Sequence, residues 1–160
     1  REYKHWQHEG GISTPLIAHW PAGLAEDQRG KLNATPSHLI DIMATCVELG
    51  GASYPTKYHD ESILPMEGIS LAPTFQGKNA LRKTPIYWEH EGNRAIRIGE
   101  WKLVSKHPTG WELYNIDIDR TEMNDLADKH PARAADMAKQ WDAWAARVGV
   151  LPWPLKQRSN

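Results

Sequence analysis

Residues 85–116, PIYWEHEGNRAIRIGEWKLVSKHPTGWELYNI, contain the pattern that decides the predicted fold. Four segments of this stretch have the aromatic and β-branched composition of strands, and they are residues 85–90, 94–98, 101–106 and 111–116. Between the second and the third, Gly99-Glu100 fits a two-residue hairpin with glycine at its first central position. The sequence therefore predicts an antiparallel meander of four strands.

One helix is predicted to follow the meander. Over residues 131–148 apolar side chains recur at helical spacing, and they are Met137, Trp141, Trp144 and Val148. We expect this apolar face to lie on the sheet. A capped helical turn is predicted over residues 121–126. The tail of residues 151–160 contains two prolines and is expected to follow the surface or to fray.

Two elements are predicted upstream of the meander. Residues 16–20 lie between two prolines and follow Gly10-Gly11, which is typical of a short strand. A helix is predicted to start at Thr35-Pro36 and to stop at Gly50-Gly51. Its apolar stripe consists of Leu39, Ile40, Met43, Cys46 and Val47.

The order of these elements predicts an α+β chain in two parts. Residues 52–82 are rich in turn formers and read as a long surface connection. We therefore place one domain at residues 1–82 and a second, made of the antiparallel sheet and its helix, at residues 83–160. The eight tryptophans are interpreted mainly as core residues.

Composition excludes several classes of partner. Among 160 residues, 19 Lys and Arg are interspersed with 20 Asp and Glu, so the basic patch of a nucleic-acid or membrane-surface binder is missing. A single cysteine excludes an intramolecular disulfide. No apolar run approaches the length of a membrane span, and the first residues lack an initiator methionine and a signal-peptide pattern. We expect the chain to begin inside a longer gene product.

Spacing alone names no reaction, because the sequence has no Gly-rich phosphate loop, no His-Glu-x-x-His helix and no cysteine-based zinc pattern. Its densest polar cluster is residues 4–11, in which Lys4 precedes a Glu-Gly-Gly turn. This block resembles a segment of the sulfatase family, and it continues through Ile12, Pro15 and residues 16–21. Three further blocks follow in the family's order: residues 38–45 with 67–71, residues 87–97 with 99–104, and residues 112–116 with Asp119, Glu122, Asn124 and 126–127.

The resemblance is nearest to bacterial arylsulfatases and implies an alkaline-phosphatase-like fold. In that fold a large α/β domain precedes a small four-stranded antiparallel sheet with a C-terminal helix, so residues 1–82 would be the end of the large domain. The implied parent enzyme hydrolyses sulfate monoesters with a formylglycine, made from Cys or Ser in a Cys/Ser-x-Pro/Ala-x-Arg motif, beside a bound calcium. The missing N-terminal domain is then the first partner of this chain.

The chain itself contains no nucleophile and no metal ligand of that mechanism. Cys46 is followed by Val47-Glu48-Leu49-Gly50, which is not the formylglycine motif, and its place on the apolar stripe predicts a buried structural thiol. The eight histidines are scattered and predict no zinc site. We therefore expect the 160 residues alone to be inactive, because nucleophile and metal supply most of the rate.

Lys4 is the one residue to which the resemblance gives a place in the core chemistry. The matching lysine of the family contacts the sulfate group, where an ammonium offsets negative charge. We expect Lys4 to be displaced when the upstream domain is absent, since no surrounding residues would then hold a lysine so close to the chain end. Weaker candidates for substrate binding lie in polar loops, and they are His5, His8, His90, Asn93, Arg94 and His107.

Other readings stay open at this point. The parent could hydrolyse phosphonate or phosphate monoesters, since such enzymes share the superfamily, or the chain could be a non-enzymatic remnant or binding module. The substrate of a sulfatase parent would be a small sulfate ester or a sulfated glycan. The family resemblance favours a periplasmic or secreted location. Apolar surface left by a missing domain, around residues 16–20 and 36–49, predicts a homo-oligomer of the fragment.

Overall fold

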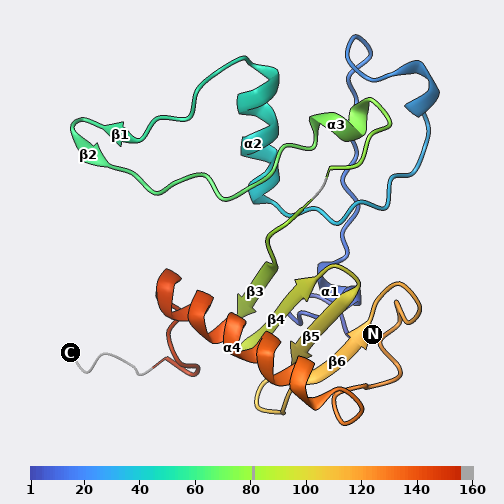
Figure 1. Ribbon diagram of the computed structural model, residues 1–160, viewed down its shortest axis with the longest axis vertical. Coiled ribbons are helices and arrows are strands. Elements are labelled where there is room, and N and C mark those ends of the chain that lie inside the picture. The colour runs from blue at the N-terminus through green and yellow to red at the C-terminus, as the bar shows by residue number, and fades with distance from the viewer. Residues whose placement is uncertain (81, 156–160) are drawn as a thin grey trace. The chain divides into compact units, whose positions relative to one another are not determined.

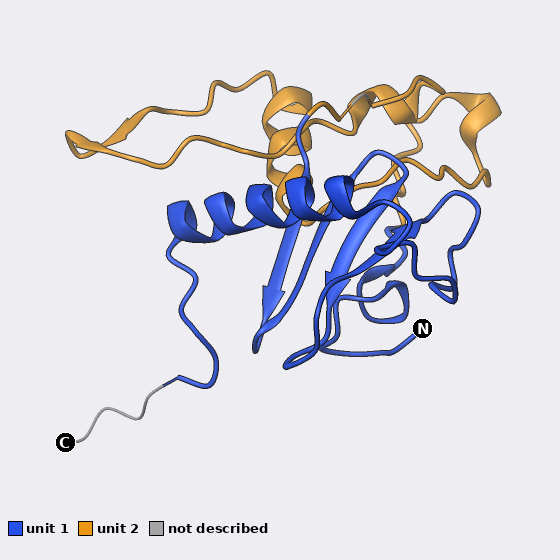
Figure 2. Ribbon diagram, turned by 60° about the horizontal axis from the view of Figure 1, so that its bottom comes forward, with its two compact units in different colours: residues 1–16, 84–160 blue, residues 17–83 orange. Residues whose placement is uncertain are grey.

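The computed structural model describes residues 1–80 and 82–155, and it divides the chain into two compact units. One unit contains Arg1–Leu16 and the chain from Thr84 onward, and the other is Ile17–Lys83 (Figure 2). The chain thus changes unit next to the predicted boundary at residue 82. Residues 1–16, however, lie in the unit that holds the sheet rather than in the unit that precedes it.

The sheet has four antiparallel strands in the order β3-β4-β5-β6, as the meander predicted (Figure 1). The strands are β3 Ile86–His90, β4 Asn93–Ile98, β5 Trp101–Ser105 and β6 Glu112–Asn115. Glu91 and Gly92 join the first pair with φ of 51° and 78°, which is the backbone of a type I′ hairpin. Gly99 opens the second turn at φ 58°, so the predicted hairpin at Gly99-Glu100 is confirmed.

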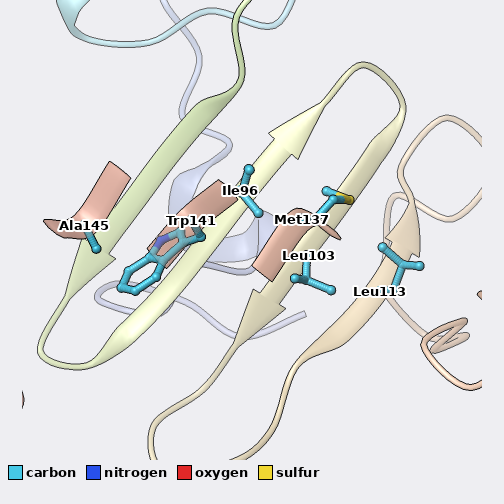
Figure 3. Packing of buried hydrophobic residues seen from close by; sticks show 6 residues of the cluster. All are labelled: Ile96, Leu103, Leu113, Met137, Trp141 and Ala145. Atoms are coloured by element: carbon cyan, nitrogen blue, oxygen red, sulfur yellow. The ribbon is translucent and has the colours of Figure 1, made fainter. Parts of the chain in front are cut away.

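The helix α4, Pro131–Val148, covers one face of this sheet (Figure 3). Ile96, Leu103 and Leu113 are neighbours in register on β4, β5 and β6, and they form the sheet side of the core. Met137, Trp141 and Ala145 form the helix side. The predicted helix is therefore confirmed, except that Val148 is 46% exposed at its C-terminal end. Gly149, at φ 76°, stops it.

The second unit is organised around α2, Ile40–Leu49. Its other elements are the 3-10 helix Glu26–Gln28, the hairpin of β1 Lys57–Tyr58 with β2 Glu61–Ser62, and α3 Ala72–Phe75. The buried Asp41 carboxylate accepts hydrogen bonds from the backbone N–H groups of His38 at 2.7 Å and Ile69 at 2.9 Å, and it also pairs with Arg82. The Asp41 carboxylate thus holds the residue that precedes the first turn, and the helix starts at Ile40. The predicted start at Thr35-Pro36 is wrong, and the predicted end at Gly50 is confirmed.

The predicted apolar stripe of this helix is not its buried face. Asp41, Ala44 and Thr45 are buried, whereas Met43 is 57% exposed and Cys46 is exposed, so the buried structural role predicted for Cys46 is wrong. A hydrogen bond explains which face of the helix is buried. The Thr45 hydroxyl accepts the N–H of Leu71 at 2.9 Å, and this bond places the 67–71 segment over that face. Gly68 permits the contact, because a Cβ there would collide with the carbonyl oxygen of Ile40.

Two short predicted elements are absent from the described chain. Residues 16–20 have no strand partner and are irregular, so that prediction is wrong. Residues 121–126 form a loop instead of a helical turn, because the Asp119 carboxylate accepts the N–H groups of Met123 and Asn124 at 3.0 and 2.8 Å. Of the predicted tail, residues 151–155 are irregular, and residues 156–160 lie outside the described residues.

The core predicts a sharp difference between two methionines. Met137→Ala should lower the free energy of unfolding of the sheet unit by about 3 kcal/mol, because Met137 is 2% exposed between the helix and the sheet. Met123→Ala is the matched control, since Met123 is 68% exposed and should change stability by less than about 0.5 kcal/mol. Urea titration followed by tryptophan fluorescence measures both, and equal losses would contradict the described packing.

Candidate functional site

The N-terminal segment, residues 1–12, lies on the face of the sheet opposite α4. Leu103 and Leu113 point to α4, so their strand neighbours Lys102 and Tyr114 point to the other face. In Figure 1, α4 crosses in front of the strands and α1, Glu9–Ile12, lies behind them. The candidate site is built where this segment meets the polar side chains of the sheet.

The inner part of this interface is a buried ion cluster. The Lys102 side chain has no exposed surface, and its Nζ lies 2.8 Å from Oε1 of Glu122 and 2.9 Å from Oε1 of Glu9. The other oxygen of Glu122 accepts the backbone N–H of Glu9 at 2.8 Å. One ammonium is therefore shared by two carboxylates that come from opposite ends of the chain.

The outer part of the interface is centred on Glu112. One of its oxygens lies 2.7 Å from the Arg1 guanidinium and 3.0 Å from Nε2 of the buried His8, and the Tyr114 hydroxyl donates to it at 3.0 Å. Burial alone would raise the pKa of Glu112, but the hydrogen bonds from His8, Arg1 and Tyr114 outweigh burial and lower it. Burial beside this carboxylate raises the pKa of Tyr114 far above its usual value.

The two glycines that follow Glu9 let the segment fold back on itself. A Cβ on Gly10 would collide with the carbonyl oxygen of Glu2, and a Cβ on Gly11 would collide with that of Trp6. The N–H of Gly10 donates to the carbonyl of Arg1 at 3.2 Å. The Glu-Gly-Gly pattern therefore has a physical meaning: the glutamate binds Lys102, and the glycines bring α1 onto the preceding turn.

Lys4 stands at the tip of that turn. Its side chain is exposed, and its backbone has φ 52°, an uncommon conformation for a residue with a Cβ. The segment is held on one side by Glu2, which pairs with Lys106 at 3.0 Å, and on the other by His8 and Glu9. Within the described chain no hydrogen bond or ion pair engages the Lys4 ammonium, so it is available to an anion.

Two other candidates lie beside this turn. The rings of His5 and His90 stack with centroids 5.9 Å apart and an angle of 11° between their planes, and both residues are exposed. His8, by contrast, is fully buried against Glu112 and holds the segment in place. The structure therefore brings Lys4, His5 and His90 to one side of the sheet.

The remaining candidates do not join them. Asn93 is buried and ties two loops together, accepting the N–H of His107 at 3.0 Å and donating to the carbonyl of His90 at 2.9 Å. Arg94 points to the α4 face, where its guanidinium lies 4.2 Å from the centre of the Trp111 ring. Arg94 and His107 line a pocket of about 350 Å³ on that side, together with Trp153.

Sequence reasoning missed the residues that hold the segment: Lys102, Glu112, Tyr114 and Glu122. A signal was present in Lys102, which is a charged residue in a predicted strand between Trp101 and Leu103-Val104. Among the residues that the structure describes, no group of three or more His, Cys, Asp or Glu could hold a metal ion. The helices of the same residues include none that is long and apolar enough to cross a membrane.

Comparison with known proteins identifies the family. The family described as "N-sulphoglucosamine sulphohydrolase, C-terminal" matches residues 3–143. The chain is the C-terminal portion of a sulfatase-family protein. An uncharacterized sulfatase of Schizosaccharomyces pombe is 30% identical over 153 residues, which are 91% of this chain and 27% of that protein. Choline-sulfatase of Rhizobium meliloti is 29% identical over 81% of this sulfatase chain and 24% of its own length.

Solved structures agree on the fold of this sulfatase portion. Ps i-CgsB superposes with a TM-score of 0.64 and 27% identity, covering 88% of this chain and 29% of that one. The predicted α+β class and the predicted sheet with its C-terminal helix are confirmed. The chain spans about a quarter of the length of the curated relatives named above.

The folded-back turn predicts different outcomes at two glycines. Gly10→Ala should loosen residues 1–12, because the new Cβ meets the Glu2 carbonyl, and amide hydrogen exchange over this segment should become faster. Gly110→Ala is the matched control, since a Cβ there meets nothing within 4 Å. Unchanged exchange in the Gly10 variant would contradict the described packing.

The lowered pKa of Glu112 predicts how stability changes with pH. A carboxylate whose pKa is lower in the folded state stabilises the fold above its ordinary value of 4.5 and loses this effect as pH falls through the folded-state pKa. The thermal midpoint of the wild type should therefore fall more steeply than that of Glu112→Gln between roughly pH 6 and pH 3. Parallel curves in calorimetry would refute this account of Glu112.

Proposed function

We propose that this chain is the C-terminal part of an arylsulfatase-type sulfuric ester hydrolase, and that it contributes the Lys4 ammonium to the sulfate site. The observation that supports the proposal is the Lys4 turn itself. It is anchored on both sides by ion pairs, and it presents an unpaired cation in the block that resembles the sulfatase motif. Membership of the sulfatase family supports the same reaction class.

The chemistry of Lys4 follows from charge. When the S–O bond of a sulfate ester breaks, negative charge grows on the leaving oxygen and remains on the nonbridging oxygens of the sulfate. An ammonium fixed beside these atoms stabilises that charge in the transition state. The positive φ of Lys4 and the anchors around it fix where the side chain leaves the backbone. The ammonium therefore has a defined starting position before a substrate binds.

We assign the formylglycine and the calcium to the rest of the parent protein. The described residues contain no cluster of side chains that fits a metal ion, and Cys46 lies outside any formylglycine motif. When bound, a divalent metal supplies further charge stabilisation to the sulfate group. The part of this chain is to place one cation, and the 160 residues alone are proposed to be inactive.

Within the sulfate esters, a sulfated glycan is the proposed substrate class. The N-acetylgalactosamine-6-sulfatase of Rattus norvegicus is 26% identical over 69% of this chain, and the matched region is 20% of that protein's length. Ps i-CgsB, at 27% identity, has been solved in complex with k-i-k-neocarrahexaose. The stacked pair of His5 and His90 beside Lys4 is proposed to contact such a substrate.

Lys4→Ala in the full-length protein tests this role. The value of kcat/KM for an aryl sulfate should fall by about 100-fold, because one preorganised cation is removed from the transition state. Lys4→Arg should retain part of the activity. Lys31→Ala, which alters an exposed lysine of the other unit, is the control and should leave kcat/KM unchanged. Wild-type activity in Lys4→Ala would refute the assignment.

Two comparisons separate the competing functions. Hydrolysis of aryl sulfate should be faster than that of the matching aryl phosphonate, and the reverse order would replace a sulfatase by a phosphonate monoester hydrolase. The 160-residue chain should show no turnover of either ester. Turnover by the chain alone would mean that it carries its own nucleophile, which contradicts the proposal.

A further inference from the structure

We infer that Lys102, held between Glu9 and Glu122, is a positioning residue that sets the location of the Lys4 ammonium. The inference rests on the proposed function of Lys4 and goes beyond it, because Lys102 acts through Glu9 and touches neither the substrate nor the reacting atoms. The buried charge of Lys102 would thus affect the reaction rate, although the strand that carries it mainly packs in the core.

The charge of Lys102 is not what the sheet requires. The residue lies inside β5 with no exposed surface, next to the fully buried Leu103, and an apolar side chain at such a place would pack without losing solvation. Burying an ammonium costs solvation, and a buried ion pair is often no more stabilising than apolar residues of similar volume. The ammonium therefore serves the segment that it binds rather than the sheet.

That segment has little apolar anchorage. Its buried side chains are those of Gln7 and His8, and both are polar. The α1 helix is four residues long and contains no buried residue. Polar contacts with the sheet and with the loop after β6 therefore decide where residues 1–12 lie. The shortest of them at α1 are the contacts of Glu9 with Lys102 and Glu122.

If Glu9 moves, Lys4 moves with it, because the backbone of α1 is in direct contact with the backbone of Lys4. A Cβ built on Gly11 would lie 2.9 Å from the carbonyl oxygen of Lys4, so α1 packs against the Lys4 peptide itself. The N–H of Gly10 is bonded to the carbonyl of Arg1. The turn that carries Lys4 is thus clamped against α1, and α1 is fixed by the Lys102 ammonium.

The second carboxylate is directed by its own loop. Glu122 is fully buried at φ 57°, a left-handed conformation, and its N–H donates to the carbonyl of Asp119 at 3.1 Å. The hydrogen bond from the N–H of Asn124 is the main cause of the lowered pKa of Asp119, and this bond closes the loop. This loop therefore holds the Glu122 carboxylate against Lys102 and against the backbone of Glu9, in the segment that carries Lys4.

A double-mutant cycle in the full-length enzyme tests the inference. Lys102→Met should lower kcat and kcat/KM for an aryl sulfate together, by about 30-fold, as expected when a transition-state contact is weakened. In a Lys4→Ala background the same substitution should lower them by less than about 3-fold, because its effect acts through Lys4. Equal losses in both backgrounds would overturn the inference.

Controls separate positioning from loss of folding. Met137→Ala loosens the opposite face of the same sheet, and its effect should be the same with and without Lys4. If Lys102→Met alone does not fold, Lys102→Met/Glu122→Gln removes one of the two carboxylate charges that have lost the Lys102 ammonium and enters the same cycle. If Lys4→Ala alone is fully active, the proposed function fails. If Lys4→Ala is impaired and the two effects multiply, only the positioning role fails.

Discussion

The buried ammonium of Lys102 joins parts of the chain that are 93 residues apart in sequence. It lies on the face of the sheet that α4 does not cover, and it binds carboxylates from the N-terminal segment and from the loop after β6. Without it the carboxylates of Glu9 and Glu122 would keep only longer contacts with cations, to Arg120 and to the N-terminal ammonium at 3.9 Å each. Arg1, Glu2 and His8 hold the start of the segment through Glu112 and Lys106, and Lys102 holds its α1 end, which packs against the Lys4 peptide.

The four blocks of sequence that resemble sulfatases contain residues that contact one another in the structure. Glu9-Gly10-Gly11 forms an anchored fold-back, and residues 67–71 dock on α2 through Asp41 and Thr45. The strands of the third block contribute the Lys102 ammonium, and the last block contributes Glu122. The first, third and last blocks thus meet at one interface of the sheet unit, and the two parts of the second block meet at an interface of the other unit. A family pattern spread over the chain corresponds to a small number of buried polar contacts.

Much of the fold could be predicted, because periodicity and turn residues are local signals. The four strands, the hairpin at Gly99 and the helix that starts at Pro131 all followed from short-range patterns. The buried face of α2 could not be predicted, since Asp41 and Thr45 are buried there by accepting the backbone N–H groups of Ile69 and Leu71, which are distant in sequence. The same limit applies to the candidate site, for which the family resemblance proposed Lys4 and in which Lys102 was missed.

A crystal structure of the full-length protein with inorganic sulfate bound tests the central claim most directly. The account predicts that Nζ of Lys4 lies within hydrogen-bond distance of a sulfate oxygen, while Nζ of Lys102 remains between Glu9 and Glu122. A sulfate ion bound in the active site with Lys4 turned away from it, or with Lys102 released from Glu9, would contradict the account.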